Sequence, residues 1–325
     1  MVKSNKVIVG YSIVSPLHLI NFLTYLQSCE EDFHERYLFI GNYWGDSIIP
    51  QRYIDYCKQK NINVILNEEE KKRILNNLSK SERNIFFVCV KSPNLYILKK
   101  GFSKNIEKII IIDEGLSSYA GFFHSFKATF REKNIKGVFK VLLYIVITKF
   151  LQIFIQYKIY RFTAFHGENI NSTYKKYFLQ VLKDINISSF GDKIGEKSIL
   201  FCTQPLIEIG LMSYSEYEEM ISEVRAICKS SNILLLIKKH PVDKIFKYSG
   251  YNIVNFDGIV EELVVTQENI IGTISSSSTS SLLIPACMNK KSYIVSFKSL
   301  SKMDSNLKAL FQKYCKSIDR VNDIN

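Results

Sequence analysis

The sequence predicts an α/β protein that contains two doubly wound, Rossmann-like domains. Short apolar runs rich in Ile, Val and Phe alternate along the chain with segments of helical length. Near-continuous apolar strands separated by helices are typical of parallel sheets that are covered on both faces. The chain has 325 residues, which is too long for one small core and suits two domains of roughly 150 residues each.

The expected strands form two groups along the chain. The first group is KVIVGYS (6–12), RYLFIGN (36–42), INVILN (62–67), NIFFVCV (84–90) and KIIIIDE (108–114), and the second is SILFCTQ (198–204), NILLLIKK (232–239), NIIGTIS (269–275) and SYIVSF (292–297). The helical segment 213–230 opens with Ser-x-x-Glu at Ser213 or Ser215, the pattern of a capping box. We therefore expect an N-terminal domain at 1–190 and a C-terminal domain at 191–325.

The composition is that of a packed globular protein with reduced thiols. Hydrophobic residues make up 46% of the chain. The cysteines are odd in number, scattered and never in CxxC spacing: Cys29, Cys57, Cys89, Cys202, Cys228, Cys287 and Cys315. This pattern argues against a disulfide framework and a zinc site and favours a cytosolic setting. The start, MVKSNKVIVGYSIV, has no long apolar core or small-residue cleavage site, so we expect a first strand and no signal peptide.

The net charge of +12 is concentrated in the N-terminal domain at 127–161. This region holds eight Lys or Arg residues and one acid, Glu132, interleaved with apolar side chains. Lys140 and Lys149 limit its apolar run to eight residues, which is too short to span a bilayer. A basic apolar helix of this kind can lie on an anionic membrane surface, or it can pack in the core with its lysines extended outward. Nucleic-acid binding is disfavoured because no recognition motif accompanies the charge.

Ligands of doubly wound sheets bind beyond the carboxyl ends of the strands, and one strand end here is acidic. Asp113-Glu114-Gly115 directly follows four consecutive isoleucines. A carboxylate at the end of a buried strand is partly desolvated, which raises its pKa and strengthens it as a proton acceptor. The alternative is a solvated turn, because acidic residues before a glycine are common in turns.

Two strand ends in the second half suit an anion. His240-Pro241 follows an apolar run and two lysines, and the proline holds the histidine in an extended conformation. Gly272 permits a close backbone approach, and the serines at 275–278 lead into a predicted helix, whose free N–H groups can bind a phosphate. The alternatives are an exposed histidine and a serine-rich helix cap. No GxxxxGK[ST] sequence is present, which excludes a P-loop.

In this order and spacing the motifs resemble the bacterial sialyltransferases of glycosyltransferase-B (GT-B) architecture, including lipooligosaccharide sialyltransferases and capsular polysialyltransferases. The resemblance rests on Asp113-Glu114-Gly115, His240-Pro241 and Ser275-Ser276, with SPLHLINFL (15–23) and CTQPLIEIGLMSYSEY (202–217) as weaker likenesses. It implies an active site in the cleft between the domains, a CMP-sialic acid donor and an inverting transfer without a metal or other cofactor.

The resemblance also implies a role for each motif residue. Asp113 is the expected general base, with Glu114 as its orienting neighbour or substitute. His240 is expected to stabilise or protonate the departing CMP phosphate. The other residues expected at the donor are Pro241, Thr203, Gln204, the serines Ser275, Ser276 and Ser277, and Glu261 or Glu262 at the ribose, with Glu262 favoured because apolar residues follow it.

The predicted function is therefore transfer of sialic acid to a hydroxyl of a bacterial surface glycan, such as capsule or lipooligosaccharide. We expect a lipid-linked acceptor and a location at the inner face of the cytoplasmic membrane. Two alternatives remain at this point. One is another cytidylate-donor glycosyl or polyol-phosphate transferase, and the other is a non-catalytic, membrane-peripheral anion-binding protein.

Overall fold

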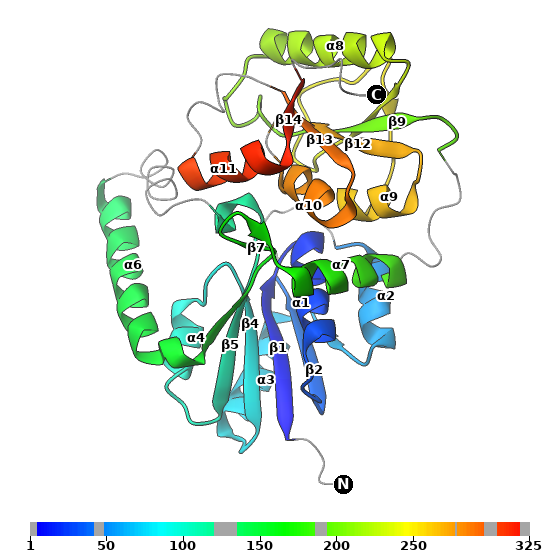
Figure 1. The fold of residues 1–325 in the computed structure, drawn as a ribbon. Helices are drawn as coiled ribbons and strands as arrows, with labels where there is room; N and C mark the ends of the chain where they lie inside the picture. The colour runs from blue at the N-terminus through cyan, green and yellow to red at the C-terminus, as the bar shows by residue number, and fades with distance from the viewer. Residues whose placement is uncertain are drawn as a thin grey trace. The chain divides into compact units, whose positions relative to one another are not determined.

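The computed structural model describes residues 5–41, 49–119, 135–185, 194–276, 278–295 and 304–318. The chain divides into two compact units, Met1–Ala164 and Phe165–Asn325. Each unit is built on a six-stranded sheet in which all paired strands are parallel, with helices packed against it (Figure 1). This confirms the predicted α/β class with two Rossmann-like sheets.

The first unit has the strand order β3-β2-β1-β4-β5-β6. Its strands are β1 (Lys6–Ile13), β2 (Glu35–Ile40), β3 (Asn63–Ile65), β4 (Asn84–Val90), β5 (Ile106–Ile112) and β6 (Ile159–Phe162). Its helices are α1 (Pro16–Ser28), α2 (Gln51–Gln59), α3 (Glu68–Lys80), α4 (Leu95–Lys100) and α6 (Ile135–Ile155), with the short 3₁₀ turns η1 (Leu116–Ser118) and η2 (Gln156–Lys158). The isoleucines 109–112 are all buried, as expected for a strand covered on both faces.

The second unit has the order β11-β10-β9-β12-β13-β14, which repeats the arrangement of the first. Its strands are β9 (Ser198–Cys202), β10 (Leu234–Lys238), β11 (Asn252–Ile253), β12 (Ile270–Ser275), β13 (Lys291–Ile294) and β14 (Lys316–Ser317), and a separate antiparallel pair is formed by β7 (Phe165–His166) and β8 (Asn169–Ile170). Its helices are α7 (Ser172–Ile185), α8 (Tyr214–Ser230), α9 (Val260–Thr266), α10 (Thr279–Met288) and α11 (Ser305–Tyr314). In both units the direction of winding reverses at the central strand, where doubly wound folds bind their ligands.

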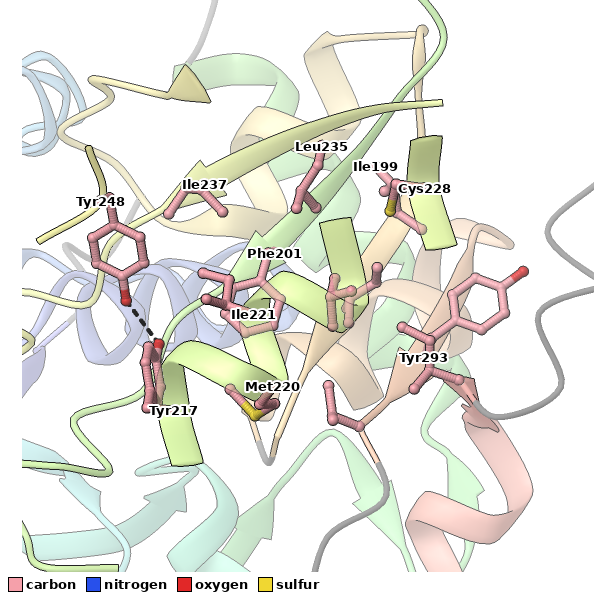
Figure 2. Close-up of a cluster of buried hydrophobic side chains, with 14 of the residues drawn as sticks. Ile199, Phe201, Tyr217, Met220, Ile221, Cys228, Leu235, Ile237, Tyr248 and Tyr293 are labelled. Atoms are coloured by element: carbon pink, nitrogen blue, oxygen red, sulfur yellow. Dashed lines mark hydrogen bonds between the residues drawn. The ribbon is translucent and has the colours of Figure 1, made fainter. Parts of the chain in front are cut away.

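The core of the second unit contains a buried polar pair among apolar side chains (Figure 2). The hydroxyl oxygens of Tyr217 and Tyr248 lie 2.7 Å apart, and the Tyr248 hydroxyl donates to the carboxylate of buried Asp243 at 2.6 Å. Because these polar atoms satisfy one another, the aromatic rings can be buried without an unpaired hydroxyl. The network ties α8 to the segment that follows His240.

Two local expectations are confirmed by atomic contacts. The α8 capping box forms at Ser213, whose side chain accepts from the backbone N–H of Glu216 while the Glu216 carboxylate accepts from the Ser213 N–H. At Gly272 the close approach is to a neighbouring strand, because an added Cβ would lie 2.3 Å from the carbonyl oxygen of Lys291. All seven cysteines are free thiols.

The boundary between the units lies earlier than the predicted 190/191, at Ala164/Phe165. The reason is the packing of α7, which contacts α9 and α10 of the second sheet. Tyr174, Phe178 and Leu182 of α7 are buried. The amphipathic pattern of α7 shows that it has an apolar face to bury, but not which sheet covers that face.

The basic apolar region is partly described, from residue 135 onward. There it forms α6, which packs against α4 and leaves several large apolar side chains exposed: Leu143, Tyr144, Val146, Phe150, Ile153 and Phe154. Helix α6 therefore has one face packed against the first unit, where Leu151 and Ile155 join the core, and another face whose apolar side chains are exposed. Among the described residues, no helix has both the length and the apolar character needed to cross a membrane.

Candidate active-site residues

Asp113 lies directly after β5 with its carboxylate turned into the protein. Its side chain is 3% exposed. Oδ2 accepts hydrogen bonds from the Tyr119 hydroxyl and, at 2.7 Å, from the backbone N–H of Ala164. Oδ1 is buried and has no hydrogen-bond partner among the residues that the structure describes. The carboxylate is therefore held firmly through one oxygen, and the other oxygen is available to accept a proton.

Burial raises the pKa of Asp113 to about 6, although the hydrogen bonds from Ala164 and Tyr119 act in the opposite direction. A desolvated carboxylate binds a proton more readily than one in water, because the low-dielectric surroundings disfavour its charge. Above pH 6 the group is ionised and more basic than an ordinary aspartate. These are the properties expected of a general base.

Glu114 has a different environment from its neighbour. Its side chain is 38% exposed and pairs with the Lys91 ammonium at 3.0 Å. Its backbone N–H donates to Ser118 Oγ at 2.8 Å, and Gly115 follows with a φ of 133°, a conformation that side chains with a Cβ rarely adopt. The motif is therefore both a turn and the carrier of a buried carboxylate, so the two sequence interpretations are compatible.

Two residues of α1 fix the acidic motif, and motif reasoning missed them. The Asn21 amide donates to the backbone carbonyl of Asp113 at 3.1 Å, and His18 Nε2 lies 3.3 Å from the carbonyl oxygen of Glu114. Because a carbonyl oxygen only accepts, His18 carries its proton on Nε2, and burial lowers its pKa. The sequence signal for these two residues was the segment 15–23, which the family resemblance identified as the first strand–helix turn and not as part of the site.

In the second unit three strand ends lie side by side. The pairing register aligns Lys238 of β10 with Cys202 of β9, and Cys202 with Ser275 of β12. The residues that follow these positions therefore emerge at one edge of the sheet. Thr203 Oγ1 accepts from the backbone N–H of His240 at 2.8 Å, which directly links two of the predicted donor residues.

The imidazole of His240 is partly buried and its tautomer is set by the backbone. Nδ1 accepts from the N–H of Val242 at 3.2 Å, so Nε2 bears the proton in the neutral ring. Burial lowers the pKa of His240, while the charge of Asp243 acts in the opposite direction. At neutral pH His240 is therefore a neutral hydrogen-bond donor through Nε2. Pro241 follows it in an exposed turn.

The serine cluster joins β12 to α10. Ser275 and Ser276 are buried, and Ser275 Oγ lies 2.5 Å from Ser281 Oγ. Ser278 is the N-cap of α10, and its side chain accepts from the Ser280 N–H. Ser277 lies outside the described residues. Hydroxyls and backbone N–H groups at a helix start provide donors for an anion.

Both acidic residues predicted near the ribose are buried in α9. Glu261 is in hydrogen-bond contact with Ser280, and burial raises its pKa. Within the described parts of the chain, its Oε1 has no hydrogen-bond partner. Glu262 is fully buried. The sequence argument favoured Glu262, whereas the unpartnered oxygen and the contact with the α10 start belong to Glu261.

Gln204 follows Thr203 in the loop after β9, and its carbonyl accepts from the N–H of Leu206. Within the described parts of the chain, no group of three or more His, Cys, Asp or Glu residues is placed to hold a metal ion. Metal independence stays a prediction.

Comparison with protein families identifies the chain. Residues 48–296 match the alpha-2,8-polysialyltransferase family, a range that contains the acidic, His-Pro and serine motifs. The chain belongs to this family. The predictions of a sialyltransferase group and of a glycosyltransferase are confirmed. No curated protein sequence matches the chain significantly.

Two solved structures are similar to this polysialyltransferase-family member. One is a 2,6-sialyltransferase from Vibrionaceae Photobacterium sp. JT-ISH-224 in a complex with CMP and lactose, with 14% identity, a TM-score of 0.50 and coverage of 96% of this chain and 78% of that chain. Another is the UDP-GlcNAc 2-epimerase from Neisseria meningitidis, with 11% identity, a TM-score of 0.49 and coverage of 95% and 91%. The likeness to the sialyltransferase confirms the predicted GT-B type of fold.

Proposed function

We propose that the protein transfers sialic acid from CMP-sialic acid to a hydroxyl of an acceptor glycan by single displacement with inversion and without a metal. The observation that carries the proposal is Asp113, a buried carboxylate with a pKa of about 6 and one oxygen without a partner, in the acidic motif of a sialyltransferase family. Asp113 takes the proton of the acceptor hydroxyl as its oxygen bonds to the anomeric carbon. The bond from that carbon to the CMP phosphate breaks, and CMP leaves with the electron pair.

The second unit supplies the groups that stabilise the leaving phosphate. His240 Nε2 donates a hydrogen bond, and the start of α10 adds the N–H and hydroxyl donors near Ser276 and Ser278. Preorganised donors of this kind stabilise developing negative charge without a cation. Thr203 holds the backbone of His240 and is therefore a positioning residue.

We assign the ribose to Glu261 in this proposal. A buried carboxyl with an unpartnered oxygen carries a desolvation cost, and hydroxyl donors from a ligand would relieve it. Its contact with Ser280 places it beside the helix start that suits the phosphate. Glu262 then serves the packing of α9.

The direct test is incubation with CMP-sialic acid and a panel of galactoside and sialoside acceptors, followed by measurement of CMP release and mass spectrometry of the products. We expect CMP release that depends on an acceptor and persists in EDTA. Binding of CMP without turnover of CMP-sialic acid would favour another cytidylate-donor transferase. Absence of both binding and turnover would overturn the proposal.

We further propose a bacterial surface glycan on a lipid carrier as the acceptor, and a location at the inner face of the cytoplasmic membrane. Support comes from α6, whose exposed apolar side chains include Phe150 and Ile153, close to Lys149 and Lys158 in the sequence. Apolar side chains with nearby lysines match an anionic bilayer surface.

Co-sedimentation with vesicles tests this surface. Wild type is expected to bind vesicles that contain anionic lipid, with weaker binding at high salt. The double variant Phe150→Glu/Ile153→Glu should lose most of the binding. Leu66→Glu is the matched control, because Leu66 is an exposed apolar residue outside α6. Equal sedimentation of wild type and the double variant would remove the membrane from the proposal.

A further inference from the structure

The first unit contains a pocket that none of the motif residues lines. Its volume is about 460 Å³, which lies in the range of small-ligand sites. It opens beside the ends of β1 and β2 and is walled by the first turns of α3 and by α4. The lining residues used below are Tyr11, Glu68, Lys71, Lys72, Asn76 and Tyr96.

One wall of the pocket is aromatic. The rings of Tyr11 and Tyr96 are nearly parallel, with centroids 6.4 Å apart and an angle of 13° between the planes. The Tyr11 ring makes an edge-to-face contact with Phe87. The Tyr96 ring is 36% exposed and can contact a ligand. A rigid aromatic surface with one exposed ring provides contact area at a low cost in conformational entropy.

Polar and charged side chains of α3 also line the pocket, and their charge balance is positive. The Lys71 ammonium is buried and bonds to the Ile40 carbonyl and to Glu68, so these two charges compensate each other. Lys72 and Asn76 are exposed one turn apart on α3. Among the described residues neither side chain has a hydrogen bond or an ion pair. They are therefore available to a ligand that carries an anionic group and hydroxyls.

The pairing register relates the pocket to Asp113. Tyr11 of β1 aligns with Cys89 of β4, and Cys89 aligns with Ile111 of β5. Two strand spacings are about 10 Å, and Asp113 comes two residues after Ile111. The pocket is therefore at the same carboxyl edge of the sheet as the proposed base. It is too distant for the same sugar ring and close enough for another ring of one oligosaccharide.

We propose that this pocket binds an acidic sugar ring of the acceptor glycan, at a distance from the ring whose hydroxyl reacts. The ring lies against Tyr96, its carboxylate faces Lys72 and its hydroxyls bond to Asn76. This inference rests on the proposed function, because it assumes a glycan acceptor. It adds a specificity site, which makes longer acidic acceptors bind better than short ones.

Direct binding tests the pocket without need for turnover. The full-length protein is titrated with α2,8-linked sialic acid oligomers of two and five residues, and binding is followed by calorimetry and saturation-transfer NMR. For the longer oligomer we expect Tyr96→Ala to raise Kd about tenfold and Lys72→Gln about three- to tenfold. The dimer, which is too short to reach both sites, should show little change. Tyr96→Phe keeps the ring and should bind as wild type does.

Matched controls separate the pocket from general effects on the surface. Phe102→Ala removes another exposed aromatic ring just after α4, and Lys80→Gln removes an exposed lysine at the other end of α3. Both should bind as wild type does. Unchanged binding by Tyr96→Ala and Lys72→Gln would overturn the proposal, as would a neutral glucose oligomer of five residues that binds as tightly as the acidic one. If Tyr96→Ala does not fold, Lys72→Gln decides the question, with Lys80→Gln as its matched control.

The two proposals fail in different ways. If the pocket proposal is wrong and the proposed function is right, CMP release still depends on an acceptor. The pocket variants then have the same KM as wild type for acceptors of every length. Loss of the proposed function would abolish turnover of CMP-sialic acid with every acceptor, while length-dependent binding that is sensitive to Tyr96 and Lys72 could still be measured.

Discussion

The two units share one strand order and use their strand ends in opposite ways. Among the described residues of the first unit, the carboxylate of Asp113 is buried with one oxygen unpartnered. In the second unit Thr203, His240 and Ser275 take part in local hydrogen bonds at adjoining strand ends. The comparison shows that one topology can place a carboxylate of raised pKa at a strand end in one sheet and hydroxyl and imidazole groups at the strand ends of the other. The buried carboxyl of the second unit, Glu261, lies on helix α9 and not at a strand end.

The same physical cause acts on both ionisable groups. Burial raises the pKa of Asp113 to about 6 and lowers the pKa of His240, because a low-dielectric environment favours the neutral form of each. At pH 7 and above Asp113 is ionised while His240 is neutral. That combination is what the proposed reaction requires of a base and of a hydrogen-bond donor.

The largest expected effect separates Asp113 from Glu114. Asp113→Asn should lower turnover by at least about a hundredfold, the usual scale for removal of an acid–base group. Glu114→Gln should lower it less than about tenfold, because Glu114 is solvated and paired with Lys91. Rates of CMP release for both variants decide this, with Glu30→Gln as an exposed acidic control. Similar losses for Asp113 and Glu114 would show that the carboxylates share one role, and full activity of Asp113→Asn would support a non-catalytic protein.

A second prediction defines the role of His240. His240→Ala should lower turnover about a hundredfold, whereas His240→Gln should recover part of it, because the Gln amide N–H can replace Nε2 as a donor. The same substitutions at His166, which is exposed, serve as the control. Wild-type turnover should stay level from pH 7 to 9, since a neutral donor does not titrate there. No recovery by Gln, together with a decline above neutral pH, would mean that His240 protonates the leaving group.

The pH dependence of stability tests the environment of Asp113 independently of activity. The folded pKa of about 6 is above the ordinary value of 3.8, so the protonated form favours the folded state. This contribution is complete below about pH 4 and is lost as pH rises through 6, by up to about 3 kcal/mol. Asp113→Asn cannot ionise, so the difference in Tm between wild type and variant should change across this window. A constant difference would mean that Asp113 is solvated. Turnover should fall on the acid side of the same window.

The smallest expected effect concerns a helix cap in the second unit. Ser278→Ala removes the side chain that accepts the Ser280 N–H at the start of α10 and should lower the free energy of unfolding by about 1 kcal/mol. Ser213→Ala removes the cap of α8 and should cost a similar amount. Only Ser278→Ala should also raise KM for CMP-sialic acid. Equal KM values for the two variants would mean that the start of α10 does not contact the donor.

Local patterns allowed much of the fold to be predicted from the sequence. The long buried strands were recognised from continuous apolar runs such as 109–112, and the α8 start from its capping box at Ser213. Strands β6, β11 and β14 were missed, because they are short and do not form continuous apolar runs. Helix α7 was assigned to the wrong domain, since its apolar face does not specify the sheet that buries it.

The sequence by itself determined the α/β class, the doubly wound architecture and the acidic, histidine and serine motifs that lie within the family match. Only the tertiary structure decided that Asp113 is the desolvated carboxylate and Glu114 the solvated one, that Glu261 has the unpartnered oxygen, and that His18 and Asn21 fix the acidic motif. The physical reason is that motifs are local in sequence. Burial, pKa and hydrogen-bond partners depend on residues that are distant along the chain, as Ala164 is from Asp113.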